Sequence, residues 1–437
     1  MIRMTLTALS AAAVLGMASP ATAQDAASVA DTQAAPKEAW QEWDVAEGCR
    51  GLAPLDDAPQ GEALNYRVPS PATVAMRRQL LNPQVNSFTF READEVFANR
   101  PVPAADAPRT WTEAEGFTMP GDYQKFAYDT HTDALMVVRD GKILFEDYRN
   151  RFDPEQRHTG FSMSKTIIAM LVGQALDRGE IASIDDLATD YWPALKGGGY
   201  DGVTIRNLLE MRSGADIEER YDFGDNPSLA GCIHDTAIVL NRARFADFAI
   251  DVGRRSAPGA EFNYATLDTA VLGRILEEVS GKPLEQITQE RLWQPVGAQR
   301  EAFWLADGPP GTGRALAGMG FNATLRDFGL LGQLLLDNGV ADGVQVLPEG
   351  WVKQMTTMRP LDPETPFPGY AYQTWKLGDE PDAYSAVGLA GQYIYVHPQT
   401  RTVIVKLSHY PPAADLAGEV ADYFAMVANT PMESSAP

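Results

Sequence analysis

The order of strand-like and helix-like segments constrains the fold of this chain more than any other feature of its sequence. Runs rich in aromatic and β-branched residues occur at the two ends of the regular part of the chain, at residues 134–148 and 370–408. Helical patterns fill the stretch between them. A doubly wound parallel sheet would need strands that alternate with helices. The sequence therefore predicts a mixed α/β fold of the α+β kind, in which an antiparallel sheet flanked by helices is joined to a helical domain, with a cleft between them.

Local patterns place the individual elements. Two β-rich runs, 134–138 and 143–148, flank Asp140-Gly141, a dipeptide typical of hairpin turns. Glycine follows several of the helical patterns and is a common helix stop. We expect helices at 162–178, 267–279, 325–338 and 413–427, short helical pieces over 184–250, and further strands at 370–377, 392–396 and 402–408.

The first residues read as a secretory signal. Arg3 is followed by an apolar run at 6–17 and by the small-residue cleavage site Ala21-Thr22-Ala23. No other stretch approaches the roughly 20 apolar residues that a membrane helix needs. We expect an exported, periplasmic protein without a membrane span. The predicted divisions are a signal peptide at 1–23, a leader and irregular extension at 24–120, and a main domain at 121–437 with a helical subdomain at about 182–365.

The net charge of the chain bears on its binding partners, and its two cysteines bear on a disulfide. The formal net charge is -23, from 36 Lys and Arg against 59 Asp and Glu, and such a surface repels phosphate backbones. We therefore expect no nucleic-acid partner, although an acidic surface can also serve solubility alone. After export, an oxidising compartment would permit a disulfide between Cys49 and Cys232. Two unpaired thiols are the alternative.

The tetrad Ser162-Met163-Ser164-Lys165 opens one of the predicted helices. A spacing of three residues puts the side chains of Ser162 and Lys165 on one helix face, about one turn apart. A serine becomes a good nucleophile when a base takes its proton, and both burial and a helix N-terminus favour the neutral amine of lysine. The same helix end offers N–H groups to an oxyanion. A capping serine beside a solvated lysine is the alternative, but the apolar run at 166–171 favours a buried helix and a catalytic pair.

Residues 134–195, which include this tetrad, resemble the serine β-lactamase/penicillin-binding superfamily. The similarity is to the branch of class C β-lactamases, esterases and 6-aminohexanoate-dimer hydrolases, and it extends over 204–214 and 318–351. It implies a β-lactamase/transpeptidase-like fold with the active site in the cleft and an acyl-enzyme on Ser162. We expect neither a cofactor nor a metal ion, because the chain carries no dinucleotide fingerprint, no P-loop and no paired histidine spacing.

The resemblance extends to a second motif, Asn263-Tyr264-Ala265-Thr266. By position, Tyr264 is similar to the tyrosine that shares a proton with the lysine, and a phenol beside a lysine cation can have a lowered pKa. Thr266 departs from the usual asparagine and is a candidate substrate contact. Tyr221 lies in a loop that is similar to a substrate-binding loop of amide-hydrolysing relatives. Plain packing of Tyr264 and a plain surface loop around Tyr221 are the alternatives.

The third motif of the superfamily is usually Lys-Thr-Gly or His-x-Gly. Leu389-Ala390-Gly391 stands in its place, followed by Gln392. The resemblance makes Ala390 and Gly391 candidate substrate-binding residues, and it makes the N–H groups of Ser162 and Gln392 the oxyanion hole. A plain glycine before an edge strand is the alternative reading of Gly391.

Together these motifs predict a serine hydrolase that acts on a small-molecule ester or amide. Leu389 cannot bind the carboxylate of a penicillin or a cell-wall peptide as a lysine would. We therefore expect a carboxylesterase or linear-amide hydrolase, similar to 6-aminohexanoate-dimer hydrolases, rather than a β-lactamase or D-amino-acid peptidase. A non-catalytic binding protein on the same fold is the alternative of another class, but Ser162, Lys165 and Tyr264 are all present.

Overall fold

The computed structural model describes residues 71–220, 227–308, 313–412 and 414–433. The predicted signal peptide, the residues 24–70 of the predicted leader and extension, Cys49 and Tyr221 lie outside these residues, and what was expected of them stays a prediction. Cys232 is buried in α8 and is not a free thiol, but its pairing with Cys49 likewise stays a prediction. Within the described ranges, no helix has the length and apolar character needed to cross a membrane.

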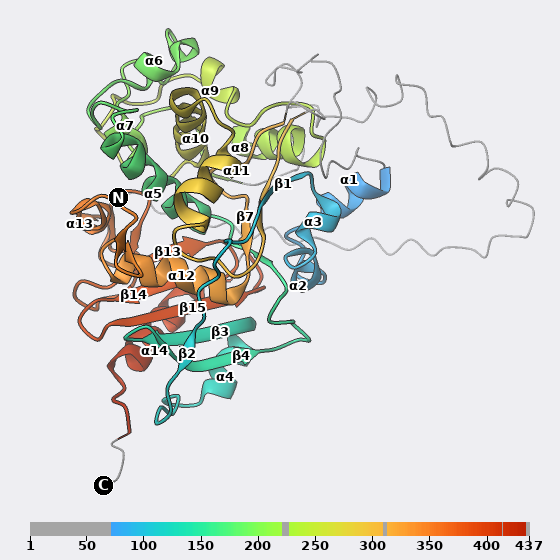
Figure 1. Cartoon of the computed structure of the whole chain (residues 1–437). Helices are drawn as coiled ribbons and strands as arrows, with labels where there is room; N and C mark the ends of the chain where they lie inside the picture. The colour runs from blue at the N-terminus through green and yellow to red at the C-terminus, as the bar shows by residue number, and fades with distance from the viewer. Residues whose placement is uncertain (1–70, 221–226, 309–312, 413, 434–437) are drawn as a thin grey trace, which may run out of the picture.

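A nine-stranded sheet dominates the described part of the chain (Figure 1). Its order is β10-β11-β12-β13-β14-β15-β3-β4-β2, and neighbouring strands are antiparallel except β2 and β4. The predicted hairpin at Asp140-Gly141 is confirmed, since both residues have positive φ and join β3 to β4. The strands are β2 Thr112–Glu113, β3 Thr132–Arg139, β4 Lys142–Tyr148, β10 Arg359–Pro360, β11 Gly369–Tyr370, β12 Trp375–Lys376, β13 Tyr384–Gly388, β14 Gln392–His397 and β15 Thr402–Ser408.

A smaller sheet of order β1-β6-β7-β5 lies beside α12 in the described structure. Its last strand, β5, leads directly into the turn before Ser162. Part of the segment expected to be irregular is regular, because β1 pairs with β6 here and β2 pairs with β4 in the large sheet. The strands are β1 Asn99–Val102, β5 His158–Thr159, β6 Ala302–Leu305 and β7 Phe321–Ala323, and a separate pair is formed by β8 Val340–Ala341 and β9 Val344–Gln345.

The long helices lie where the sequence predicts them. Gly179 and Gly281 follow α5 and α10 with positive φ of 69° and 65°, as expected of helix stops. The helices are α1 Pro71–Arg77, α2 Asn86–Thr89, α3 Ala93–Val96, α4 Tyr123–Asp129, α5 Met163–Asp177, α6 Ala188–Tyr191, α7 Ile205–Leu209, α8 Leu229–Ile233, α9 Phe248–Asp251, α10 Thr266–Ser280, α11 Leu284–Thr288, α12 Leu325–Leu336, α13 Trp351–Thr356 and α14 Ala417–Asn429. Shorter turns are the 3-10 segment Pro193–Leu195 and the π segments His234–Val239 and Gln289–Trp293.

Two hydrophobic cores lie on opposite faces of the large sheet. On one face α12 approaches so closely that a Cβ on Gly332 would lie 2.5 Å from the side chain of Val403. On the other face α4 and α14 pack together, and the rings of Phe126 and Tyr423 stack at 3.8 Å. α5 belongs to the first core and contacts α10 and β13, so it is buried almost all round. The predicted α+β architecture is confirmed.

One strand prediction needs correction, and one strand of the large sheet next to the site was not predicted. The run at 370–377 is not one strand, because Gln373 has a φ of 54° and divides it into β11 and β12. The buried Gln373 amide donates to the carbonyls of Leu208 and Leu209, so a tertiary contact overrides the local β preference. The strand that was not predicted is β13, which lies next to β14 and against α5.

Candidate active site

Ser162 follows a tight turn between β5 and α5. A Cβ on Gly160 would lie 2.9 Å from the ring of Phe328 and 3.1 Å from a backbone oxygen, so the turn needs glycine there. Phe161 has a φ of 44°, which is an uncommon conformation for a bulky residue and is typical of strained functional turns. Ser162 is partly exposed, and its backbone N–H has no hydrogen-bond partner among the described residues. The turn thus presents a hydroxyl and an N–H group together.

Lys165 lies one helical turn further, with its side chain 1 % exposed. Its Nζ donates to Ser162 Oγ at 2.9 Å, to Thr266 Oγ1 at 2.9 Å and to the carbonyl of Gly318 at 2.8 Å. Burial lowers the pKa of Lys165 to about 8, although the carboxylates of Glu219 and Asp268 act to raise it. A substantial fraction of neutral amine is therefore present near pH 8, within reach of the Ser162 proton.

Tyr264 lies on the other side of the nucleophile. Lys165 Nζ is 4.9 Å from the centre of its ring, and its hydroxyl takes part in a hydrogen bond with Ser162. Burial raises the pKa of Tyr264 well above its ordinary value, and the hydrogen bond with Ser162 opposes this without reversing it. The expected lowering of the phenol pKa is therefore wrong, because the ring packs against Trp375 at 5.3 Å and Tyr370 at 6.2 Å. Tyr264 is therefore a neutral phenol beside the serine–lysine pair.

Thr266 has a different place from the one expected of a substrate contact. It begins α10 and is 2 % exposed, with its hydroxyl accepting from Lys165 and donating to Glu219 Oε1. The N–H of Thr266 donates to Glu219 Oε2 at 2.9 Å. Sequence reasoning missed Glu219, because a single acid in a loop belongs to no motif. Thr266 accepts a hydrogen bond from Lys165, and Glu219 in turn fixes Thr266 with two hydrogen bonds.

The turn at residues 389–391, between β13 and β14, forms the opposite side of the site. A Cβ on Gly388 would lie 2.2 Å from the carbonyl oxygen of Gly160, so the end of β13 lies directly against the turn before Ser162. Ala390 and Gly391 are buried, with positive φ of 59° and 91°. A Cβ on Gly391 would lie 2.4 Å from the ring of Tyr410. Gly391 thus makes room for Tyr410, and the substrate-binding roles expected of Ala390 and Gly391 stay predictions.

Gln392 is buried and holds this turn together. Its Nε2 donates to the carbonyls of Leu389, Ala390 and Ser408 at 3.2, 3.1 and 2.7 Å. Leu389 is the partly exposed residue of the turn. The oxyanion role expected of Gln392 concerns its backbone N–H and stays a prediction.

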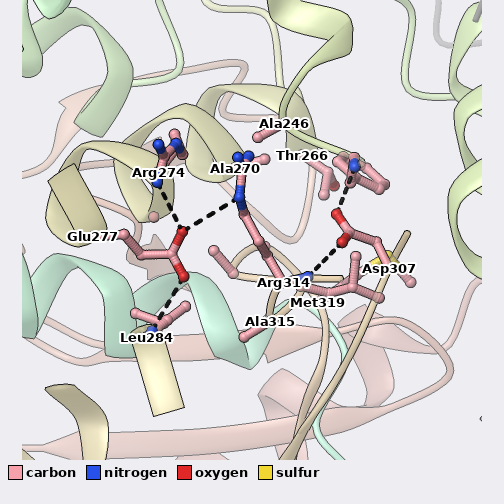
Figure 2. Close-up of a pocket in the computed structure, with 15 residues that line it drawn as sticks. Ala246, Thr266, Ala270, Arg274, Glu277, Leu284, Asp307, Arg314, Ala315 and Met319 are labelled. Atoms are coloured by element: carbon pink, nitrogen blue, oxygen red, sulfur yellow. Dashed lines mark hydrogen bonds and ion pairs between the residues drawn. The ribbon is translucent and has the colours of Figure 1, made fainter. Parts of the chain in front are cut away.

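A pocket lined mainly by apolar residues, with Arg274, Glu277, Asp307 and Arg314 among them, lies next to this site (Figure 2). Thr266 and Gly318, which both bind Lys165 Nζ, are among the residues that line it. Its charges neutralise one another, since Glu277 lies 3.4 Å from Arg274 and 3.8 Å from Arg314. Among the residues that the structure describes, no group of His, Cys, Asp and Glu is arranged to hold a metal ion.

Comparisons with known proteins agree with this geometry. The Beta-lactamase family matches residues 124–425. The 6-aminohexanoate-dimer hydrolase of Paenarthrobacter ureafaciens is 32 % identical over 303 residues, which cover 66 % of this chain and 76 % of that protein. Esterase EstB of Burkholderia gladioli is 29 % identical over 192 residues, which cover 39 % of this chain and 47 % of the esterase.

Solved structures of other proteins have a fold similar to that of this chain. A Bacillus anthracis protein assigned as a 6-aminohexanoate-dimer hydrolase superposes with a TM-score of 0.69 at 21 % identity, over 83 % of this chain and 98 % of that one. A family VIII carboxylesterase superposes with a TM-score of 0.53 at 15 % identity, over 71 % of this chain and 99 % of that one. The family match spans well over half of the sequence and includes the serine–lysine pair, and the chain belongs to the beta-lactamase family of serine hydrolases.

Proposed function

We propose that this protein is an exported hydrolase that cleaves carboxylic ester or linear amide bonds through an acyl-enzyme on Ser162. The observation that carries the proposal is the 2.9 Å hydrogen bond between Lys165 Nζ and Ser162 Oγ. It lies in a site where burial lowers the pKa of Lys165 to about 8. A binding protein on the same fold would have no use for a lysine poised in this way.

The proton follows the hydrogen bonds of the site. Ser162 Oγ attacks the carbonyl carbon while the neutral amine of Lys165 accepts its proton. The resulting ammonium is held by Thr266 Oγ1 and the carbonyl of Gly318. Tyr264, hydrogen-bonded to Ser162, relays a proton to the leaving alcohol or amine. Water then attacks the acyl-enzyme with the same base, which releases the acid and restores Ser162.

Two backbone N–H groups stabilise the oxyanion. One is that of Ser162, which has no partner among the described residues. For the second, Gln392 was the predicted donor, but Leu389 follows directly after Gly388 and is partly exposed at the turn. This placement favours Leu389. Such a donor typically stabilises a transition state by about 3 kcal/mol.

The lining of the site supports an uncharged substrate chain. Leu389 provides no cation for a substrate carboxylate, and the rings of Tyr370 and Trp375 pack against Tyr264. Phe262 in turn packs against Tyr370 and Trp375. The names of the relatives, a 6-aminohexanoate-dimer hydrolase and an esterase, agree with an amide or ester substrate. Tyr221, which lies outside the described residues, stays a proposed substrate contact.

The test compares the wild type with Ser162→Ala on short p-nitrophenyl esters, the linear 6-aminohexanoate dimer and a chromogenic cephalosporin. We expect ester or dimer turnover in the wild type, and at least a thousandfold loss in the variant, of the order found when a catalytic serine is removed. The thermal unfolding midpoint of the variant should match that of the wild type. Turnover of the cephalosporin alone would assign a β-lactamase instead, and wild-type rates in the variant would exclude Ser162 as the nucleophile.

A further inference from the structure

Lys406 is a buried cation without an acid partner in the described structure. It lies on β15 and is 0 % exposed. Its Nζ donates to the carbonyl of Thr130 at 3.0 Å and to Ser408 Oγ, and lies 5.8 Å from the centre of the Tyr410 ring. The carboxylates of Asp133 and Glu419 attract Lys406 without forming an ion pair with it.

A buried lysine in this position lowers the stability of the folded protein. Moving an ammonium group away from water costs free energy that only a close, well-oriented anion repays. Burial accordingly lowers the pKa of Lys406 to about 7. A methionine would fill much the same space without that cost. Polar groups held at a cost to folding are often those that serve a functional site.

The residues that Lys406 contacts also pack against the turn at residues 389–391. Ser408 Oγ, to which Lys406 donates, would lie 2.8 Å from a Cβ on Gly391, and Tyr410 packs against the same glycine. The backbone N–H of Ser408 donates to the side chain of Gln392 at 3.1 Å, and its carbonyl accepts from the same amide at 2.7 Å. Lys406, Ser408 and Tyr410 thus form the back wall of this turn.

The other side of this turn lies next to the residues that precede Ser162. Gly388 lies against the carbonyl of Gly160, two residues before Ser162. Within the turn, Ala390 has a φ of 59°, a conformation that alanine adopts only where the surroundings impose it. The turn is therefore strained, and the cluster behind it is what holds it.

We propose that Lys406 is a positioning residue for acyl transfer at Ser162: through Ser408 it holds the strained turn at 389–391 against the nucleophile. The proposal rests on the function proposed for Ser162. Because the oxyanion exists only in the transition state, loss of this support lowers kcat more than it raises KM.

The test is the Lys406→Met variant of the full chain, assayed with a p-nitrophenyl ester. We expect kcat to fall about tenfold, which corresponds to about 1.4 kcal/mol, while KM changes by no more than about twofold. The thermal unfolding midpoint should stay the same or rise, because the buried cation is gone and Ser408 Oγ still donates to the carbonyl of Thr130 at 3.2 Å. Wild-type kcat, or a fall in kcat matched by a fall in the unfolding midpoint, would overturn the proposal.

Two further variants separate this role from plain packing. Ser408→Ala removes the contact between Lys406 and the turn, and should lower kcat by a factor similar to that of Lys406→Met; wild-type kcat in this variant would overturn the proposal. Tyr395→Phe is the matched control: Tyr395 belongs to the same core as Tyr393, which pairs with Lys406, and its hydroxyl has no hydrogen-bond partner in the described structure. Its kcat and unfolding midpoint should equal those of the wild type; a loss of kcat as large as that of Lys406→Met would refute a specific role for the cation.

Covalent labelling by a fluorophosphonate distinguishes the two proposals. Labelling of Ser162 in the wild type that is slower in Lys406→Met supports both. Equal labelling rates in the two proteins would overturn the role of Lys406 and leave that of Ser162 intact. An unreactive Ser162 in the wild type would overturn both.

Discussion

Two carboxylates influence how readily Lys165 gives up its proton. Burial dominates and lowers the pKa of Lys165 to about 8, while Glu219 and Asp268 oppose it. Asp268 is itself buried, and burial raises its pKa to about 7, so it is only partly ionised near neutral pH. Glu219 is less buried and accepts two hydrogen bonds from Thr266. Glu219 is therefore the acid whose charge is best placed to set the working pH of the site.

Replacing Glu219 by glutamine removes this charge and keeps the shape of the side chain, with one acceptor oxygen for Thr266 in place of two. The pKa of Lys165 should fall, because its ammonium form loses an attractive partner. More neutral amine is then present at low pH, so the acidic limb of the profile of kcat/KM against pH should move to lower pH by about half a unit to one unit.

The neighbouring Glu218→Gln variant is the control for this experiment. Glu218 is exposed and lies 3.6 Å from Arg220, so its replacement should leave the limb where it is. An acidic limb that stayed in place in Glu219→Gln, or moved to higher pH, would show that the charge of Glu219 does not act on the base.

At the scale of elements, the packing of α5 fixes the nucleophile. Gly173 lies on the face of α5 that meets α13, where a Cβ would lie 2.3 Å from Trp351 Nε1. That nitrogen donates to the carbonyl of Ala169 at 2.9 Å. Alanine is the better helix former by about 1 kcal/mol, but here it would displace the indole ring. Steric contact outweighs helix propensity at this position.

Gly173→Ala should therefore reduce the free energy of unfolding by about 1 to 3 kcal/mol, as overpacked cores do. Urea denaturation measures the change. Gly253→Ala is a suitable control, because the nearest heavy atom to its Cβ would be 3.8 Å away, and it should change the stability by less than about 0.5 kcal/mol. A Gly173→Ala variant as stable as the wild type would mean that Trp351 can move aside without cost.

Local periodicity was enough to predict α5, α10, α12, the β3–β4 hairpin and β15, and the spacing of Ser162 and Lys165 predicted the catalytic pair. The remaining parts of the site depend on contacts that no local pattern records. Lys165 and Thr266 are 101 residues apart, and Glu219 is 47 residues from Thr266. β13 was missed because it combines small and polar residues, and its strand character comes from pairing with β14.

At the scale of the whole molecule, one buried carboxylate connects the large sheet to the smaller one. Asp133 on β3 is 0 % exposed and lies 3.6 Å from His158 Nε2 on β5 and 2.8 Å from His409 Nδ1 after β15. Asn150 also donates to it at 3.0 Å. Because β5 leads directly to Ser162, this cluster fixes the catalytic turn relative to the large sheet.

The cluster predicts how stability depends on pH. Burial alone would raise the pKa of Asp133, but the contacts with His158 and His409 hold it well below its ordinary value of 3.8. For a carboxyl group whose folded pKa is depressed, the stabilisation is complete above the unfolded pKa and is lost as the pH falls through the folded pKa. The wild type should therefore lose stability as the pH is lowered below about 4.

Asp133→Asn should remove both the stabilisation and this part of the pH dependence. At pH 7 we expect the free energy of unfolding to fall by about 3 kcal/mol, since the buried negative charge beside His158 and His409 is lost. The difference between variant and wild type, followed by urea denaturation, should then shrink as the pH falls below about 4, because the Asp133 carboxyl of the unfolded wild type binds a proton there while that of the folded protein does not. If the difference stayed constant across this range, Asp133 would contribute through its shape and not its charge, and the link between the two sheets would not be electrostatic.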